Sequence, residues 1–311
     1  MIITVTMNPA ADKTAETDSI KVGGLNRLRN VVIDAGGKGI NVSKTIAALG
    51  GLSIATGFIG GSAGADIEHS LQCLGITTDF VEIRRPTRTN LKVLSCDSGV
   101  TEFNEPGSAV TPDEMKSLEE KLLDYADAES GATFIFSGSL PDGVNPDVYK
   151  RLIEAVRKKG SFAFLDSDGE AFRQALTANP DFIKPNISEL QQYFGENTII
   201  HTINEQTRLC NMLIEGGVGS IALSMGERGA LFVSREEAFY APAICVKAKS
   251  TVGAGDAMVG ALAYAFEKGM DFRGAAKLAV AASAGAVMTD GTRPPGIDTV
   301  TDLLERVELT P

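Results

Sequence analysis

The stretch STVGAGD, residues 250–256, joins a strand-like segment to a long helical segment that begins with small residues. Its glycines let the backbone approach a phosphate, and the amides of Gly253, Ala254 and Gly255 at a helix start can hold negative charge. A carboxylate beside an anion site repels the charge that the site attracts. Asp256 is therefore interpreted as a base that accepts a proton from an attacking hydroxyl. The alternative is a tight glycine turn in which Asp256 only caps the helix.

Around this motif, short apolar runs rich in β-branched residues alternate with segments of helical periodicity from about residue 53 onward. This alternation is typical of βα units around a mostly parallel sheet flanked by helices, so the predicted class is α/β. Strands are predicted at residues 2–7, 53–58, 133–137, 162–166, 181–184 and 220–224. Helices are predicted at residues 41–49, 113–125, 146–159, 205–214 and 255–268.

Two stretches interrupt this rhythm, at about residues 12–33 and 87–104, and both alternate apolar and polar residues as a half-exposed sheet does. In the second stretch, LKVLSC and VTEFN flank Asp97, Ser98 and Gly99, which predicts a tight hairpin. Together the stretches are predicted to form a small β lid inserted in a single domain of residues 1–311. The outer face of such a lid needs covering, which predicts a homodimer through the lid.

A second glycine-rich segment, AGGKGIN at residues 35–41, precedes a predicted helix. Gly36, Gly37 and Gly39 expose backbone amides to a polyhydroxy ligand, and Asn41 can both donate to and accept from sugar hydroxyls. The segment is not a GxxxxGK[ST] phosphate loop, so a flexible loop with an asparagine cap remains an alternative. It also lacks the GxGxxG pattern, which argues against a dinucleotide-binding oxidoreductase.

The 311 residues carry a net charge of −11 and are 43% hydrophobic. Such an acidic chain repels nucleic-acid phosphates and no basic run offsets the repulsion, so nucleic acid is not an expected partner. No apolar run approaches the ~20 residues of a membrane helix, and the first residues do not follow the pattern of a signal peptide. We therefore expect a soluble, cytoplasmic protein that does not bind membranes.

Cysteines and histidines offer little to a reactive site. There are two histidines, too few for a catalytic triad or a histidine-based metal site to be expected. The cysteines form no CxxC pair, which disfavours a disulfide framework and a zinc site, and we expect them to be buried apolar residues. They are Cys73, Cys96, Cys210 and Cys245. The chemistry is therefore expected to use carboxylates and amides.

With these motifs in view, the sequence resembles the ribokinase-like (PfkB) carbohydrate kinases, and within them the branch that contains 1-phosphofructokinase and tagatose-6-phosphate kinase. The resemblance spans the whole chain and implies a ribokinase-like α/β fold with a small β-sheet lid. It rests on TMNPAAD (6–12), AGGKGIN (35–41), TRTN (87–90), TEFNEPG (101–107), SGSLPDG (137–143), KPN (184–186) with Glu189 behind it, LSMGERG (223–229) and STVGAGD (250–256).

For the chemical step, the resemblance implies that Gly253, Ala254 and Gly255 form the anion hole and that Asp256 is the catalytic base. It implies a sugar site made of Asp12, Gly37, Lys38, Asn41, Arg88 and Ser139. Arg88 and Lys38 would clamp the phosphate that the substrate already carries, with Arg27 or Arg29 as weaker candidates. The alternative for each arginine is a solvated surface charge, and the alternative for Asp12 is a plain turn.

For the nucleotide, the resemblance implies that ATP is bound by Lys184, Asn186, Ser224, Gly226, Gly229, Ser250 and Thr251. It also implies that Glu189 acts on Mg²⁺ through a water molecule. Asn186 and Glu189 equally fit a capping box, Lys184 could simply end a strand, and the glycines of residues 224–229 could form a hairpin turn.

Two further expectations concern the surroundings of the site. An adenine pocket is expected between the segment before residue 253 and a helix near residues 279–286. Where relatives often have a small hydroxyl residue, this chain reads Asp166, Ser167 and Asp168, so an extra carboxylate is expected at the rim of the active site.

The resemblance therefore implies an ATP- and Mg²⁺-dependent kinase that phosphorylates a ketose monophosphate. Fructose 1-phosphate is the expected substrate, and the alternatives are tagatose 6-phosphate or the substrate of a 6-phosphofructokinase. An alternative of another class is a catalytically idle sensor that binds sugar phosphate and nucleotide. The intact Asp256 argues against the sensor, because a sensor has no need of a base.

Overall fold

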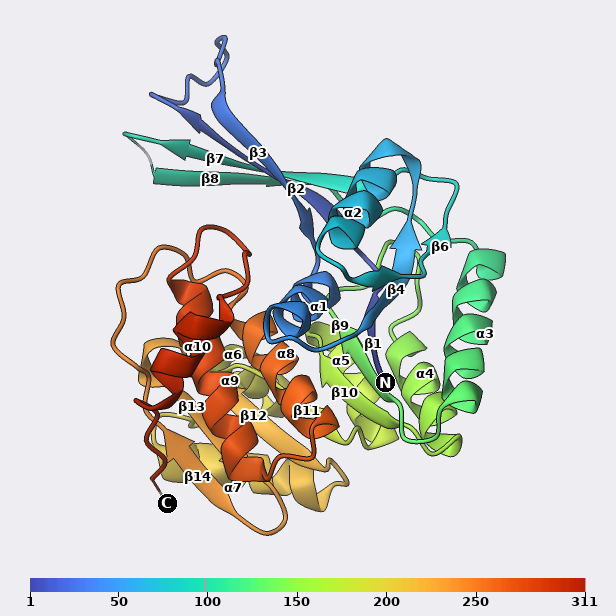
Figure 1. The fold of residues 1–311 in the computed structure, drawn as a ribbon, viewed down its shortest axis with the longest axis vertical. Helices are drawn as coiled ribbons and strands as arrows, with labels where there is room; N and C mark the ends of the chain where they lie inside the picture. The colour runs from blue at the N-terminus through green and yellow to red at the C-terminus, as the bar shows by residue number, and fades with distance from the viewer. Residues whose placement is uncertain (98, 311) are drawn as a thin grey trace.

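Ten strands of the described residues pair into one central sheet in a computed structural model that describes residues 1–97 and 99–310 (Figure 1). Parallel pairing runs from β12 to β5, and β13 and β14 add an antiparallel edge. The predicted α/β class is confirmed. In spatial order the strands are β14 (Ala238–Ala241), β13 (Ala230–Val233), β12 (Ser220–Ser224), β11 (Phe182–Ile183), β10 (Phe162–Asp166), β9 (Thr133–Ser137), β1 (Ile2–Thr6), β4 (Ile54–Ile59) and β5 (Thr77–Thr78), with β6 (Val81–Glu82) also on β4.

The central strands are apolar because helices cover both faces of the sheet. Side chains alternate between the two faces, so Phe134 and Phe136 of β9 belong to one core and Ile135 belongs to the other. The strands predicted at 133–137, 162–166 and 220–224 are confirmed to the residue. The strand predicted at 181–184 is shorter because Pro180 and Pro185, which lack an N–H, bracket it.

Two helical layers and one separate helix cover the sheet. One core contains side chains of α3 (Pro112–Ala128), α4 (Val148–Lys158), α5 (Gly169–Ala175), α6 (Ile187–Phe194) and α7 (Ile203–Glu215). The other core contains side chains of α1 (Lys38–Ala48), α8 (Ala254–Glu267), α9 (Phe272–Val287) and α10 (Ile297–Leu304). A smaller cluster forms beneath α2 (Gly61–Cys73), and two short 3₁₀ turns are η1 (Leu176–Ala178) and η2 (Gly226–Arg228).

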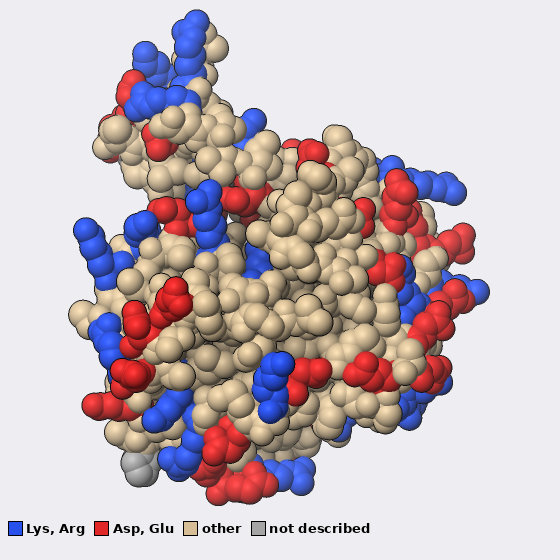
Figure 2. Space-filling view, viewed as in Figure 1, with Lys and Arg blue, Asp and Glu red and all other residues tan. Residues whose placement is uncertain are grey.

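A four-stranded sheet, here called the small sheet, projects from the body at the top of Figure 1. The two stretches predicted as a half-exposed sheet supply its strands, and β7 and β8 form the predicted hairpin, although Ser98 lies outside the described residues. A recess bordered by charged side chains separates the small sheet from the body (Figure 2). In spatial order the strands are β3 (Arg29–Gly36), β2 (Ala10–Thr17), β7 (Arg88–Ser95) and β8 (Gly99–Asn104).

The prediction that all four cysteines are buried is wrong for three of them. Cys210 is buried, whereas Cys73, Cys96 and Cys245 are exposed, and all four are free thiols. Cys73 is the last residue of α2, Cys96 lies in the turn after β7, and Cys245 lies in the loop between β14 and α8, so each is at the surface. Within residues 1–97 and 99–310, no helix combines the length and the apolar character that crossing a membrane requires.

Candidate active site

The glycine-rich loop of STVGAGD turns directly into α8. Gly253 is the residue that precedes the helix, and its φ of 84° is in the left-handed region that favours glycine. The first backbone N–H groups of α8 have no acceptor within the helix and lie at the positive end of the helix dipole. This end of α8 is therefore suited to binding an anion. A Cβ at Gly253 would lie 3.4 Å from Thr292, so the turn also fits closely against the loop after α9.

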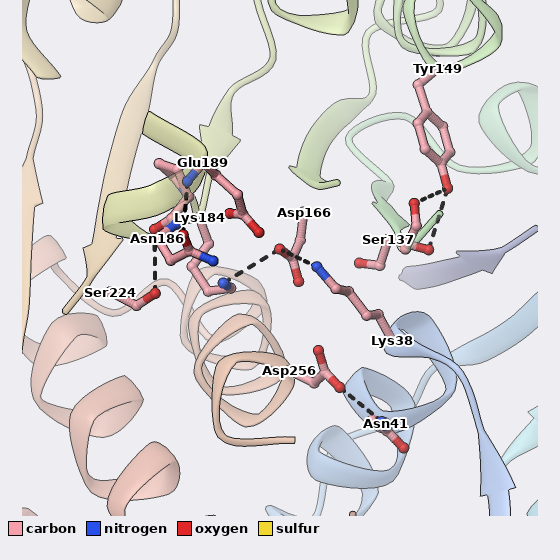
Figure 3. A network of polar contacts seen from close by, with 12 residues as sticks. Lys38, Asn41, Ser137, Tyr149, Asp166, Lys184, Asn186, Glu189, Ser224 and Asp256 are labelled. Carbon is pink, nitrogen blue, oxygen red and sulfur yellow. Dashed lines mark hydrogen bonds and ion pairs between the residues drawn. The ribbon is translucent and has the colours of Figure 1, made fainter. Parts of the chain in front are cut away.

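The Asp256 side chain does not cap this helix. Its carboxylate accepts a hydrogen bond of 2.8 Å from Asn41 Nδ2 of α1, and no side chain caps the start of α8 (Figure 3). The alternative in which Asp256 is a simple cap is therefore wrong. Burial, and next the like charge of Asp166, raise the pKa of Asp256 to about 6, while Asn41, Lys38 and Lys184 oppose the shift. A carboxylate with this pKa is deprotonated near neutral pH and is a stronger base than an exposed aspartate.

Asp166 lies at the centre of the charged network that Figure 3 shows. The sequence predicted an extra carboxylate at the rim of the active site, but Asp166 is buried and does not lie at a rim. It is the last residue of β10 and is 1% exposed. Its Oδ1 lies 3.3 Å from Lys38 Nζ and 3.4 Å from Lys184 Nζ. The sequence signal was available, because Asp166 ends an apolar strand and the carboxyl ends of parallel strands line the sites of such sheets.

The two lysines approach Asp166 from different parts of the chain. Lys38 is the first residue of α1, and Lys184 follows β11 directly. Lys184 does end a strand, but its ammonium also reaches the start of α8, where a Cβ on Gly255 would lie 3.2 Å from Nζ. Burial alone would lower the pKa of Lys38, but Asp166 and three further carboxylates raise it, so this lysine stays charged.

Asn186 and Glu189 form a capping box at the start of α6, as one interpretation of the sequence predicted. Glu189 N donates to Asn186 Oδ1 and Asn186 N donates to Glu189 Oε2, each at 2.9 Å. Burial raises the pKa of Glu189. No group of three or more acidic, cysteine or histidine side chains that could hold a metal exists among the described residues. A divalent ion here would need oxygens from a ligand or from water as well as from Glu189.

Residues 224–229 form the predicted hairpin turn between β12 and β13. Gly226 has a φ of 59° and Gly229 a φ of 96°. A Cβ on Gly229 would lie 2.1 Å from the carbonyl oxygen of Ala241, so no larger residue fits there. Ser224 begins this turn and pairs with Asn186 through a backbone bridge. The turn therefore lies beside the capping box, on the same side of Asp166 as Lys184 (Figure 3).

Asp12 and Asn90 lie opposite each other in adjacent strands of the small sheet. Asn90 Nδ2 donates to Asp12 Oδ1 at 2.9 Å, and burial raises the pKa of Asp12. Asp12 is the third residue of β2, so the alternative of a plain turn is wrong. A Cβ on Gly36 would lie 2.0 Å from Asp12 Oδ2, which explains the glycine at that position.

Arg88 begins β7 and is half-buried. It donates to the carbonyl oxygens of Glu105 at 3.2 Å and Asn8 at 3.3 Å. Its buried Nε has no hydrogen-bond partner among the described residues. A guanidinium held by backbone carbonyls with an unused donor is suited to an anionic ligand. Arg29 instead pairs with Asp18 at 2.7 Å on the exposed small sheet, which agrees with the surface-charge interpretation.

The remaining predicted residues are Gly37, Ser139, Ser250 and Thr251. Gly37 has a φ of 123° just before α1, and the exposed Ser139 accepts a hydrogen bond from Asn8. The amide of Ser250, next to Thr251, donates to the carbonyl oxygen of Val287 at 3.2 Å. This contact fastens the segment before α8 to the end of α9, where an adenine pocket was predicted. The pocket itself remains a prediction.

A family model described as pfkB family carbohydrate kinase matches residues 5–299. The chain belongs to this family. It is 35% identical over 283 residues to a 1-phosphofructokinase of Borreliella burgdorferi, covering 91% of this chain and 90% of that protein. It is also 35% identical to the ATP-dependent 6-phosphofructokinase isozyme 2 of Escherichia coli, covering 94% of each. A crystal structure of phosphofructokinase-2 from Escherichia coli, in complex with substrates and products, matches with a TM-score of 0.91 at 33% identity, covering 98% of each chain.

Proposed function

We propose that this pfkB family member is an ATP-dependent kinase that phosphorylates a hydroxyl group of a ketose monophosphate. The observation that carries the proposal is the position of Asp256. It is a buried carboxylate beside the free amides of a helix start and within the field of two lysines. This combination supplies a base for the hydroxyl and positive charge for the transferred phosphoryl group.

In the proposed reaction, the sugar hydroxyl gives its proton to Asp256 as its oxygen attacks the γ-phosphorus of ATP. The bond from that phosphorus to the bridging oxygen breaks, and ADP leaves. The amides of Gly253, Ala254 and Gly255 stabilise the equatorial oxygens, and Lys38 and Lys184 add positive charge from the other side. Asn41 orients Asp256 through the hydrogen bond described above. Asn41 and Asp256 belong to α1 and α8, which pack against each other, and the groups that stabilise the equatorial oxygens are backbone amides.

The nucleotide is proposed to lie over Lys184, Asn186 and Ser224, with Ser250, Thr251, Gly226 and Gly229 beside it. Mg²⁺ would neutralise part of the phosphate charge, and Glu189 fits a water-mediated contact to it. The fit is partial, because Glu189 Oε2 already accepts from Asn186 N in the capping box. An ion that retains several waters and binds mainly to phosphates is compatible with one such carboxylate.

For the acceptor, we propose fructose 1-phosphate, with tagatose 6-phosphate and fructose 6-phosphate as competing substrates. Arg88, Asp12, Gly37 and Ser139 are proposed to bind the sugar, with Arg88 on its phosphate. Lys38, which the resemblance assigned to that phosphate, contacts Asp166 at 3.3 Å and is proposed to act at the transferred phosphoryl group instead. Several curated relatives at about a third identity are named 1-phosphofructokinase, and one is named 6-phosphofructokinase. Both activities require a site that binds one phosphate and phosphorylates a hydroxyl far from it.

The test is a comparison of kcat/KM, from ADP release with MgATP, for fructose 1-phosphate, tagatose 6-phosphate, fructose 6-phosphate and unphosphorylated fructose. We expect the highest value for fructose 1-phosphate and the lowest for fructose. A preference for another ketose phosphate would retain the mechanism and change the substrate. Binding of sugar phosphate and ATP without turnover on any of the four would overturn the kinase in favour of the sensor.

We further propose that residues 1–311 act as one kinase domain in which the small sheet is a lid over the sugar, and that two copies pair through it. Side chains alternate across a sheet, so the face opposite Asp12 and Asn90 carries the neighbouring residues. The register aligns a row of residues across this face, and its outer members are 60% and 54% exposed. The row is Ile33, Lys13, Leu91 and Phe103.

Replacing Phe103 by glutamate is expected to convert a dimer into monomers, because a second copy would have to bury the new charge. Size-exclusion chromatography with light scattering measures the mass directly. Leu52→Glu is the matched control, since Leu52 is 85% exposed on the body and is not part of this face. A wild-type monomer, or a Phe103→Glu dimer as stable as the wild type, would contradict pairing through the small sheet.

A further inference from the structure

We propose that Asp166 is a positioning residue that holds Lys38 and Lys184 together at the site of phosphoryl transfer. It also places a second negative charge near Asp256. This inference rests on the proposed kinase function. Neither the family motifs nor the sequence interpretation gave Asp166 such a role. Figure 3 shows its position between the two lysines.

Two lysines from different parts of the chain converge on Asp166. One carboxylate oxygen of Asp166 contacts ammonium groups from two elements, α1 and the end of β11, at 3.3 and 3.4 Å. Two ammonium groups this close to one oxygen repel each other and would separate without it. Asp166 is fixed in turn, because β10 pairs with β9 and β11 on its two sides and its own carbonyl accepts from Gly138 N. The carboxylate therefore holds two long lysine side chains from a strand that is paired on both sides.

The hydrogen bonding of the Asp166 carboxylate is incomplete. Asp166 is 1% exposed, yet its Oδ2 has no hydrogen-bond partner among the described residues. The same is true of the hydroxyl of Ser137, which the sheet register places beside Asp166. A carboxylate that served only stability would be expected to have both oxygens satisfied, because an unpaired buried polar atom is costly. Such costs are typical of functional sites.

Asp166 also acts on the charge of Asp256. The charged groups that face it are Asp166 from β10, Lys184 from the end of β11, and Lys38 and Lys44 from α1. After burial, Asp166 is the largest influence that raises the pKa of Asp256, whereas Lys38 and Lys184 lower it. Removing the Asp166 charge would change the pKa of Asp256 in two ways. It removes a like charge, and it leaves the positive charges of two lysines without their carboxylate partner. Both effects lower the proton affinity of Asp256.

A metal-ligand role would have different consequences from a positioning role. A carboxylate that binds Mg²⁺ increases the affinity for the metal–nucleotide complex, so its loss weakens binding. A carboxylate that restrains two lysines competes with the nucleotide phosphates for them, so its loss leaves binding unchanged or tighter. The direction of the change in MgATP affinity therefore separates the two roles.

The test uses Asp166→Asn, which preserves shape and removes the charge. We expect the acidic limb of the kcat/KM profile for the sugar phosphate, at one fixed MgATP concentration, to move to lower pH by roughly one unit. We expect kcat to fall about 10- to 100-fold, because a weaker base slows proton transfer and displaced lysines stabilise the transferred phosphoryl group less. Calorimetry without sugar should show MgATP bound at least as tightly as in the wild type.

Two further variants give independent readings if Asp166→Asn folds poorly. Asp166→Glu keeps the charge and should retain the wild-type acidic limb, whereas Lys38→Met removes an opposing charge and should move the limb to higher pH. Asp127→Asn is the matched control, since it removes an exposed aspartate–lysine pair, 2.7 Å from Lys159, far from the site. An unmoved limb in both Asp166→Asn and Lys38→Met, or weaker MgATP binding in Asp166→Asn, would overturn the proposal. Absence of wild-type turnover would instead overturn the kinase function.

Discussion

Asp256→Asn is expected to lower kcat by about 10²- to 10⁴-fold, the usual contribution of a positioned base. The substitution is nearly isosteric, and the amide oxygen of asparagine can still accept the hydrogen bond from Asn41. Binding of MgATP and sugar phosphate should therefore remain close to the wild type. Steady-state kinetics and calorimetry on the same preparation measure both quantities. Retention of most of the activity would remove Asp256 from the role of base.

The same substitution has an expected effect on stability with a definite sign. The pKa of Asp256 is about 6 in the folded chain, above the ordinary value of 3.8. The folded state thus binds this proton more tightly than the unfolded state, and the resulting stabilisation is complete below pH 3.8 and is lost as the pH rises through 6. At pH 8 the buried charge opposes folding by about 2 to 3 kcal/mol.

Asp256→Asn should therefore unfold at higher urea concentration than the wild type at pH 8, with a much smaller difference near pH 4. This comparison also shows that the loss of activity does not come from loss of folding. A variant that is less stable than the wild type at pH 8 would show that Asp256 is held in its charged form by interactions stronger than those with Asn41, Lys38 and Lys184.

Arg88→Met is expected to lower kcat/KM for the phosphorylated ketose by about 10- to 100-fold, mostly through KM, because it removes charge-assisted hydrogen bonds to the phosphate. Its effect on unphosphorylated fructose should be small. The prediction follows from the unused buried Nε and from the two backbone carbonyls that fix the guanidinium. Measuring both substrates with each variant separates loss of phosphate recognition from general damage.

Arg88→Lys keeps the charge without the planar fork and should lie between wild type and Arg88→Met. Arg85→Met is the control, since Arg85 is exposed and three positions away. An equal loss on fructose and on the sugar phosphate would indicate that Arg88 only ties β7 to its neighbours and does not bind the phosphate.

Local patterns in the sequence predicted several of the strands and helices, although α2, β13 and β14 are not among the predicted ranges. The apolar strands and the helices between them were clear because each has its own periodicity. The capping box of Asn186 and Glu189 and the hairpin at Gly226 and Gly229 were both anticipated, since each depends on residues close in sequence. The stretches that form the small sheet were found because their alternation differs from that of the buried strands.

Contacts between distant residues were beyond these patterns. The position of Asp166 between Lys38 and Lys184 depends on strand order, which no local signal carries. Asp256 was open to interpretation as a helix cap because its hydrogen-bond partner belongs to α1. The exposed cysteines show the same limitation, since exposure depends on which face of an element meets the rest of the chain.

The hydrogen bond between Asn41 and Asp256 joins residues 215 positions apart, and every strand of the central sheet except β1 lies between them in the sequence. Closing so large a loop is entropically unfavourable until most of the sheet exists, and parallel sheets with such distant contacts fold slowly. The site should thus be one of the last parts of the chain to assemble during folding. A nascent or partly folded chain would hold Asp256 in water with an ordinary proton affinity, and activity would appear only together with the complete tertiary structure.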